Sequence, residues 1–552
     1  MISTKTLPAL ARPSAAGGAL LAICLSLLFA AWLYPDGFLS GQSAFWLRQN
    51  ADITQYQAGF HAFIHEPWHW PLFRIESVNW PNGTLITFVD GIPLYAALLK
   101  LLRHGPDTPY WNPYGGWVVL CYAMQGLGAW WVCREARLRS WTALAVLAVL
   151  LASFPVFSYR VNHLSLMSQW LLVFGLACYL RGTRQGAQAW KAWAVLLVCA
   201  FYINIYLFSM LSGLFFADLA RFARSAGWRG SARAVLASYG VLGLSLFVTM
   251  LPLPGAAGSS EGGFGIYSMN LLAPLAGGRL LDFGAAMASP GQGEGYNYAG
   301  VFVLAMFALA LVLRRRAGAG FLPRHGALAA VLLLATLYAL SNQVYAGQAH
   351  LLDLRMPSWT FIITGQLRAS GRFYWLVGYA MVVVTVIMLA RHGGRAGAPL
   401  LALLAVLQLW DLAPSHAERR RQAGEGGPTM VQAAAWDNFF GAEATTLYFF
   451  PAFQCGKSPS DATLMPTMLY AAERGLRMST GYVARAKSPC SVYDAVFRRA
   501  AGLGAVFVLA RDDYPTIDSA VDFLGGPAVA HCITADYAHL CKRPPGPARL
   551  AP

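Results

Sequence analysis

The sequence predicts an all-α polytopic membrane bundle of about 11 transmembrane helices, with a small extracytoplasmic α/β domain at its C-terminal end. Hydrophobic residues make up 57% of the 552 residues and charged residues only 12%, whereas a soluble chain carries about 25% charged residues. Apolar blocks close to the length that crosses a bilayer recur from residue 16 to residue 412. Strand-like and helical runs alternate after residue 414, which indicates the α/β domain.

Short clusters of basic residues separate the apolar blocks and set the predicted topology. The net charge of +16 gathers in these clusters rather than along one groove, so we expect no nucleic-acid partner. Clusters of this kind mark the cytoplasmic loops of membrane proteins, which puts the N-terminus inside and the C-terminal domain outside. The clusters are Arg134/Arg137/Arg139, Arg181/Arg184/Lys191, Arg221/Arg224/Arg229/Arg233, Arg314/Arg315/Arg316/Arg324 and Arg391/Arg395.

Single apolar blocks predict most of the spans, and residues 191–220 predict two more. The first block is long, lacks a cleavage site of small residues and precedes further spans, so we interpret it as a retained signal anchor. Residues 191–220 must leave and re-enter the cytoplasmic side, so we expect a short helical hairpin broken near Tyr202–Asn204. The single spans are expected at residues 17–34, 113–133, 141–157, 164–181, 234–253, 299–314, 325–341, 373–391 and 398–413.

The stretch 87–102 is apolar but is not predicted to cross the membrane. Asp90, Gly91 and Pro93 interrupt it, and a span there would reverse the side of every later basic cluster. We expect an amphipathic helix at the membrane interface instead. The segments expected outside are residues 35–112, 158–163, 254–298 and 342–372 and the tail from Ala413.

The predicted domains are residues 1–414, which form the transmembrane part with the large first outer loop 35–112, and residues 415–552, which form the α/β part. The expected location is a bacterial inner membrane. A flexible linker, ERRRQAGEGGPT, is expected between the domains. The strand-like runs are TTLYFF, AVFVLA and AVAHCITA, and the helical runs are DATLMPTMLYAAERG, SVYDAVFRRAAG and IDSAVDFLG.

Four of the nine cysteines lie in the tail, and the other five lie in or beside predicted spans. A thiol within a span behaves as a small apolar residue. An even number of cysteines in a domain outside the cell membrane indicates two disulfides, with four ordinary thiols as the alternative. Spacing favours Cys532–Cys541 within one hairpin and Cys455–Cys490 as the longer link.

The first outer loop, residues 35–112, is rich in acids, histidines and tryptophans. From Asp52 onward, Tyr56, Phe60 and Phe63 recur at helical spacing, which predicts a helix with one apolar face. The helix dipole favours an acid in the first turn of a helix. Considered alone, Asp52 is therefore best interpreted as such a first-turn acid.

Three elements follow one another in this loop: Asp52, then Trp68/Trp70-Pro71, then Asp90-Gly-Ile-Pro93-Leu94. Their order and spacing resemble the outer loop of the GT-C membrane glycosyltransferases, most closely the aminoarabinose lipid A transferases and the protein O-mannosyltransferases. The resemblance extends in pattern from the first span to residue 220 and beyond that only in architecture. No second acid follows Asp52 directly, which departs from the better-known members and makes a metal-bound donor less expected.

The resemblance implies a GT-C-like fold and transfer of a sugar, by direct displacement, from a polyprenyl-phosphate carrier to an extracytoplasmic glycan, lipid or protein. In that family the acid matching Asp52 acts as general base or orients the acceptor. An attacking hydroxyl or amine must lose a proton, and a leaving lipid phosphate needs cations rather than an acid. No cofactor or metal is expected. Secondary candidates in the same loop are Gln55, Tyr56, Glu66 and Asp90.

Arg368 and Arg372 are the first candidates for the cationic site. They lie outside, against the positive-inside bias, and on a helix their spacing of four residues would put them on one face. Arginine binds phosphate through two parallel hydrogen bonds; contact with lipid headgroups or Asp353 is the alternative. Arg160 and His163, in the short loop 158–163, are expected either to contact the donor phosphate or to orient the first loop.

The remaining features carry weaker signals. His61, His65 and His69 recur every four residues, but the intervening Pro67 breaks a helix, so an aromatic interfacial belt is favoured over a metal site. The glycine-rich segment 254–298 lacks the strand-to-helix context of a nucleotide-binding loop and is expected to be a mobile loop over the cavity. Its secondary acid candidates are Glu261, Asp282 and Glu294.

Two non-enzymatic functions stay open. The first is a non-catalytic scaffold, or a component of polysaccharide or lipid-carrier export, that kept the same fold. The second, less favoured, is a solute transporter, since no repeat of the transporter kind is visible. An enzyme should bring Asp52 and the outer arginines into one pocket, whereas a scaffold need not. The partners expected of an enzyme are a polyprenyl-phosphate-linked sugar, an extracytoplasmic acceptor and membrane lipids.

Overall fold

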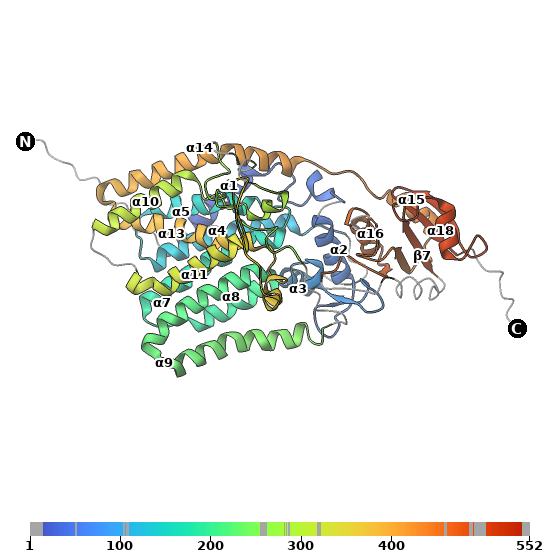
Figure 1. Ribbon diagram of the computed structural model, residues 1–552, viewed down its shortest axis with the longest axis horizontal. Coiled ribbons are helices and arrows are strands. Elements are labelled where there is room, and N and C mark those ends of the chain that lie inside the picture. The colour runs from blue at the N-terminus through green and yellow to red at the C-terminus, as the bar shows by residue number, and fades with distance from the viewer. Residues whose placement is uncertain are drawn as a thin grey trace, which may run out of the picture.

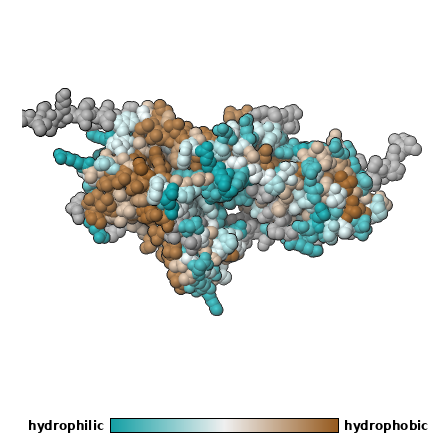
Figure 2. Space-filling model, turned by 90° about the horizontal axis from the view of Figure 1, so that it is seen from above, coloured by the Kyte–Doolittle hydropathy of each residue, from teal (hydrophilic) through white to brown (hydrophobic). Residues whose placement is uncertain are grey.

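A bundle of long helices forms one end of the molecule, and a small sheet domain forms the other (Figure 1). The computed structural model describes residues 15–49, 52–102, 105, 110–253, 262–280, 282, 284, 287–316, 322–457, 461–484, 490 and 504–543. On the face drawn in Figure 2, hydrophobic residues gather over the helical end, and hydrophilic residues are more frequent over the sheet domain. The bundle helices are α1 (Ala15–Leu33), α4 (Tyr114–Glu135), α5 (Trp141–Ala152), α7 (Trp170–Gln185), α8 (Trp190–Ile203), α9 (Ile205–Thr249), α10 (Val301–Arg316), α11 (Leu322–Leu340), α13 (Trp375–His392) and α14 (Gly397–Gly424).

Within the described residues, seven helical segments are long and apolar enough to cross a membrane. They confirm the prediction of several spanning helices and indicate a multi-pass membrane protein. Helices α8 and α11 are apolar but shorter, so the total of about 11 spans stays a prediction. The seven segments are Ala15–Leu33, Tyr114–Glu135, Trp141–Ser158, Leu164–Gln185, Ile205–Thr249, Ser370–His392 and Gly394–Gly424.

The chain turns at Asn204, inside the interval where the sequence predicts a break. Asn204 is extended (φ −162°, ψ 128°), and its side chain accepts a hydrogen bond from the backbone N–H of Tyr206, which caps α9. The 45 residues of α9 contain a second break at Gly227, whose φ of +64° suits glycine. Gly227 lies within the basic cluster around Arg221–Arg233 and divides α9 into two helices.

The first outer loop folds into short elements around α2 (Asp52–His65). Residues 87–102 do not form the single predicted helix, because Asp90 is left-handed (φ 53°) and the helix begins only at Pro93. Lys100 is fully buried, and its ammonium donates to the backbone oxygen of Phe63 (2.6 Å), so α3 is tied to the last turn of α2. The other elements of the loop are η1 (Ala44–Leu47), β1 (Arg74–Ile75), β2 (Thr84–Leu85), η2 (Ile86–Val89) and α3 (Pro93–Leu102).

Short elements also fill the later outer segments. Strands β3 and β4 form an antiparallel hairpin between α11 and α13. Other short turns of helix occur next to the spans. These elements are α6 (Pro155–Ser158), η3 (Leu164–Met167), η5 (Pro290–Gly295), β3 (Gln343–Ala346), β4 (Ala349–Asp353), η6 (Ser358–Thr360), α12 (Phe361–Thr364), η7 (Ser370–Tyr374) and η8 (Gly394–Ala396).

The C-terminal part contains a five-stranded sheet with the order β6-β5-β7-β9-β8, as the alternating runs predict for a small α/β domain. Strands β5 and β7 are parallel and completely buried, which explains their continuous apolar sequences. Strand β9 was not predicted, and the predicted helix at residues 491–502 lies outside the described residues. The elements are α15 (Ala433–Phe440), β5 (Thr446–Phe450), α16 (Asp461–Glu473), β6 (Arg477–Met478), β7 (Ala505–Ala510), α18 (Ile517–Leu524), β8 (His531–Ala535) and β9 (Ala538–Lys542).

Both cysteine pairs favoured by the spacing are bonded. Cys532 and Cys541 lie opposite each other on the hairpin β8–β9. Cys455, which follows β5, is joined to Cys490. The free thiols of Cys121, Cys133 and Cys178 are buried among the helices, Cys199 is half-buried and Cys24 is exposed.

The predicted flexible linker at residues 418–429 is wrong in its first half, because α14 continues through Pro414 to Gly424. Residues 417–423 favour helix, and Arg421 pairs with both Glu418 and Glu425 at helical spacing. The proposed domain boundary at residues 414/415 therefore falls within a helix. The chain leaves helical conformation only at Glu425.

The sheet domain docks on the first outer loop through backbone hydrogen bonds. The N–H of Met478 donates to Ser77 (2.6 Å), and the N–H of Trp80 donates to Met478 (2.9 Å). Farther along, the N–H of Ala484 donates to Phe88 (2.8 Å). Helix α16 packs against α2, as Figure 1 also shows. The domain thus covers the loop that carries Asp52.

Candidate functional site

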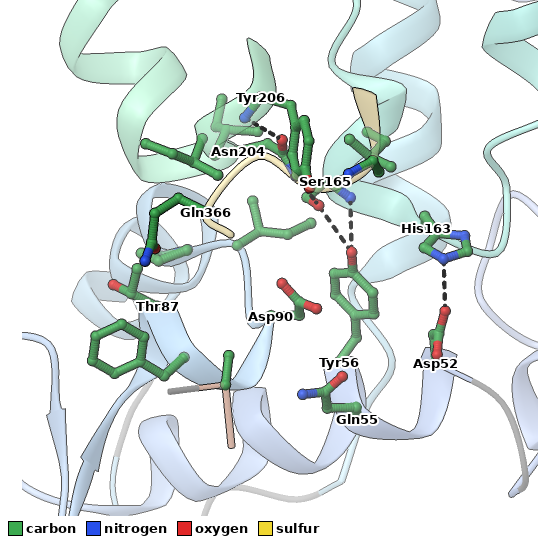
Figure 3. A pocket seen from close by; sticks show the side chains of 18 of the residues that line it. Asp52, Gln55, Tyr56, Thr87, Asp90, His163, Ser165, Asn204, Tyr206 and Gln366 are labelled. Carbon is green, nitrogen blue, oxygen red and sulfur yellow. Dashed lines mark hydrogen bonds and ion pairs between the residues drawn. The ribbon is translucent and has the colours of Figure 1, made fainter. Parts of the chain in front are cut away.

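A cavity of about 670 Å³ lies where one end of the helical bundle, the loop of residues 35–112 and the sheet domain meet. Segments far apart in the sequence line it, as Figure 3 shows for the part around α2. A largely apolar part of its wall consists of Phe201, Ile203 and Ile205 in α8 and α9 and of Met250 and Leu253 just after α9. The predicted site residues that line it are Asp52, Gln55, Tyr56, Asp90, His163, Glu294, Arg368 and Arg372.

Asp52 begins α2 and pairs with His163 from the loop between α6 and η3. Its carboxylate oxygen Oδ2 lies 2.8 Å from Nε2 of the imidazole (Figure 3). The two side chains are 39% and 35% exposed, so both are held by the pair and remain accessible from the cavity. This carboxylate is therefore oriented by a neighbouring cation or hydrogen-bond donor rather than only capping its helix.

Glu294 lies between two arginines at the side of the same cavity. Arg160 donates to its carboxylate (2.7 Å) and to its backbone oxygen (2.8 Å), and Arg372 donates through Nε (2.8 Å). Burial alone raises the pKa of Glu294, but the charges of Arg160 and Arg372 outweigh it and hold the pKa well below its usual range. Glu294 is therefore ionised, and it fixes both guanidinium groups.

Asp90 follows η2 in the left-handed turn and points into the cavity near Tyr56 (Figure 3). Its side chain meets cavity solvent but is surrounded on all sides by protein, and this desolvation raises its pKa to about 6. The negative charge of Asp52 also raises it, whereas His163 and Arg372 oppose the shift. The cavity thus holds a fixed carboxylate at Glu294 and a titratable one at Asp90.

Tyr56 connects α2 to the helix break at Asn204. Its hydroxyl accepts a hydrogen bond from the N–H of Ser165 (3.2 Å) and shares another with the hydroxyl of Ser165 (2.9 Å). The amide of Asn204 donates to the same serine hydroxyl (3.0 Å). Because Tyr56 is buried and follows Asp52 by one helical turn, this network fixes the start of α2.

Arg368 and Arg372 both line the cavity, but they do not lie on one helix as predicted. Arg368 lies in the irregular segment after α12, and Arg372 lies in η7. Arg368 donates to the backbone oxygen of Gly262 (3.3 Å) and lies over the ring of Tyr267. Arg372 lies 4.5 Å from the ring centre of Tyr206 and is 12% exposed. Ala369, which lies between them, is not helical (φ −80°, ψ 68°), and it interrupts the continuous helix that the spacing suggested.

Among the described residues, three predicted site candidates do not line the cavity, namely Glu66, Arg160 and Asp282, and the candidate Glu261 lies outside the described residues. Glu66 accepts hydrogen bonds from the N–H groups of Glu76 (2.8 Å) and Ser77 (2.7 Å) and thereby fixes the loop after α2. Arg160 is 2% exposed and lies beside the ring of Trp375, so it acts on the cavity only through Glu294. Tyr482 and Ala484 of the sheet domain line the cavity unpredicted, since nothing in their sequence marks this contact.

The histidine series at positions 61, 65 and 69 does not meet at one point suited to a metal. His61 is buried and stacks on Tyr110 (4.3 Å between ring centres), whereas His69 follows the end of α2 and pairs with Glu66 (3.1 Å). In the described ranges, no group of three or more His, Cys, Asp and Glu residues is arranged to hold a metal ion.

Two solved structures of the oligosaccharyltransferase of Archaeoglobus fulgidus are among those that match the chain. The first, tethered with an acceptor peptide containing the NVT sequon, gives a TM-score of 0.40 at 13% identity. The second, in complex with an inhibitory peptide and a dolichol-phosphate, gives 0.36 at 12%. Each match covers 84% of this chain and 64% of the archaeal chain, so the chain spans less than two thirds of these proteins. No curated protein matches the chain.

Two family descriptions match consecutive parts of the sequence. Residues 435–543 match the "DUF6311 C-terminal domain", which includes most of the sheet domain. Residues 23–413 match "Domain of unknown function (DUF6311)", and this range includes most of the helical bundle and every charged residue of the cavity. Because the match to residues 23–413 covers well over half of the chain, the chain belongs to the DUF6311 family.

Proposed function

We propose that the chain is a membrane glycosyltransferase that transfers a sugar from a polyprenyl-phosphate carrier to an extracytoplasmic acceptor. One observation carries the proposal: Asp52, paired with His163, opens onto the same cavity as Arg368 and Arg372. A base and a cationic site for a phosphate in one cavity are what such a displacement requires.

Asp52 is the proposed general base. The acceptor oxygen or nitrogen forms a bond to the anomeric carbon, the bond from that carbon to the phosphate oxygen breaks, and the acceptor proton passes to Asp52. His163 keeps one carboxylate oxygen fixed at 2.8 Å, which leaves the other oxygen for the acceptor. A positioned carboxylate contributes about 100- to 10,000-fold to such a step.

The leaving lipid phosphate takes the electron pair of the broken bond and is proposed to lie against Arg368 and Arg372. Glu294 holds Arg372 through one edge only, Nε and one terminal nitrogen, which leaves the other terminal nitrogen for a phosphate oxygen. The apolar wall at Phe201, Ile203 and Leu253 suits the start of an isoprenoid chain.

The proposal is tested by Asp52→Asn in proteoliposomes supplied with a panel of polyprenyl-phosphate-linked sugars and a bacterial envelope extract as the acceptor. We expect sugar transfer to fall by at least about 100-fold while the protein stays folded. Asp36→Asn is the matched control, because Asp36 is an exposed acid of the same outer loop outside the cavity. Transfer by Asp52→Asn at a near-normal rate would overturn the assignment.

A further inference from the structure

A long run of exposed residues, many of them apolar, begins at strand β4 of the hairpin β3–β4 and continues beyond it. Residues 348–359 and 361–363 are all exposed, although eight of them are large hydrophobic residues. The most exposed are Ile362 (76%), Trp359 (68%) and Leu351 (57%). An exposed apolar surface of this extent marks an interaction site rather than ordinary surface. We call residues 351–363 the apolar strap; its eight large hydrophobic residues are Leu351, Leu352, Leu354, Met356, Trp359, Phe361, Ile362 and Ile363.

Hydrogen bonds hold the strap at its two ends. At its start, the hairpin is fixed to residues 270–271 because Leu271 donates to Tyr345 and Gly347 donates to the side chain of Asn270, both at 2.9 Å. After its end, the backbone oxygen of Leu367 accepts a hydrogen bond from Tyr338 in the last turn of α11 (3.1 Å). The strap therefore lies at the level where the bundle ends.

The strap continues an apolar surface of the bundle. Leu333, Leu334 and Leu337 form an exposed stripe on α11, between 54% and 64% exposed, that leads toward the hairpin. On the other side, the apolar segment Ser370–His392 begins only seven residues after the strap. The outward faces of apolar membrane helices contact lipid. A surface that continues these faces is expected to contact lipid as well.

We propose that the apolar strap is an interfacial anchor that lies in the outer leaflet of the bilayer. Its composition suits this partner, because Trp359 and Arg355 are residues that favour the headgroup level and the other large side chains reach toward the acyl chains. Its backbone also suits shallow burial, since η6 and α12 satisfy part of their polar groups internally, as in the bond from Gly365 N–H to Phe361 (2.9 Å).

The anchor has a consequence for access to the cavity. Gly365, Gln366, Arg368 and Ala369 follow the strap directly, and all of them line the cavity. The rim of the cavity is therefore attached to the membrane surface, so that a ligand with a phosphate headgroup and an embedded chain reaches Arg368 without leaving the bilayer. The anchor itself does not depend on the proposed sugar transfer.

The test places a fluorescent label on the strap of the full chain in lipid nanodiscs. Ile362→Cys and, separately, Trp359→Cys are labelled with an environment-sensitive fluorophore after Cys24→Ala and Cys199→Ala remove the more accessible free thiols. Asp522→Cys, on the exposed face of α18 in the sheet domain, is the matched control. Quenching by nitroxide-bearing phospholipids is compared with quenching by aqueous iodide.

We expect the lipid quencher to act several-fold more strongly than iodide at both strap positions, and the reverse at position 522. Stronger quenching by iodide at both strap positions would overturn the anchor. A second copy of the chain is the competing partner, and it is separated by repeating the measurement in nanodiscs that hold a single copy. A copy that covers the strap would shield the label from both quenchers, so iodide quenching that appears only in the single-copy nanodiscs assigns the strap to contact between copies. Strong lipid quenching in both preparations supports the anchor.

Discussion

Two carboxylates a short distance from Asp52 occupy opposite electrostatic environments. Glu294 is held by two guanidinium groups, whereas Asp90 faces the cavity with the charge of Asp52 nearby. The sequence identified both as acids of outer loops but not this contrast, because it depends on Arg160 and Arg372, which are 212 residues apart in the chain. Neutralising each of these two acids should therefore change the stability of the folded protein in a different way.

Neutralising Glu294 should destabilise the folded protein. Glu294→Gln leaves the buried Arg160 without an ionic partner, and breaking a buried ion pair from one side costs about 3–5 kcal/mol. The thermal unfolding midpoint in detergent measures the effect. Glu418→Gln is the control, because the exposed pair of Glu418 with Arg421 contributes little. Equal midpoints for Glu294→Gln and the wild type would show that Glu294 does not hold the arginines.

The ionisation of Asp90 should make the stability of the folded protein depend on pH. Its pKa of about 6 in the folded protein exceeds the ordinary value of 3.8, so the folded state binds the proton more tightly than the unfolded chain. The resulting stabilisation is full below about pH 3.8 and is lost as the pH rises through about 6. Asp90→Asn should therefore gain stability relative to the wild type at pH 7 but not at pH 4.

Unfolding midpoints of wild type, Asp90→Asn and Asp36→Asn across this pH range test the assignment. Asp36 is an exposed acid of the same loop, so its variant should follow the wild-type profile. A constant difference between Asp90→Asn and wild type at every pH would assign the effect to packing rather than to ionisation.

At the scale of elements, periodicity predicts the helices well, and local chemistry explains the exceptions. The break at Asn204 and the helix at Asp52 follow from residues within a turn of each boundary. The missed strand β9 and the helical residues 418–424 depend on partners, since β9 exists through its pairing with β7 and β8. Arg368 and Arg372 line the same cavity because of the fold around it rather than through the helix that their spacing suggests.

Lys100 is the contact through which α3 fixes α2, so Lys100→Met should loosen the helix that carries Asp52. The change removes hydrogen bonds to Phe63 and Pro67 (2.6 and 3.2 Å) and leaves both oxygens without this donor, at a cost of about 1–3 kcal/mol. Unfolding midpoints measure the loss. Lys191→Met, an exposed lysine at the start of α8, is the control and should change the midpoint little.

The residues that line the cavity support the predicted topology independently of the basic clusters. Asp52, His163, Glu294, Arg368 and Tyr482 come from the five separate segments predicted to lie outside, and all five line one cavity. Segments that share a water-accessible cavity lie on one side of the membrane, so an even number of spans must separate each consecutive pair. The predicted spans satisfy this parity, including the two arms of the hairpin at residues 191–220, which the sequence supports least.

This parity leads to a prediction for the two ends of the chain. Among the described residues, one candidate span precedes Asp52 and none follows α14, and the two disulfides suit an oxidising compartment. We therefore predict that the N-terminus lies in the cytoplasm and the sheet domain outside. Alkaline phosphatase, which folds only outside the cytoplasm, should therefore be active when fused after residue 543 and inactive when fused within the cluster Arg221–Arg233. A green fluorescent protein fused at the same two positions should give the opposite pattern. Phosphatase activity at the basic cluster would mean that residues 221–233 lie outside the cytoplasm. Asp52 and Glu294 would then lie on opposite sides of the membrane and could not share the cavity.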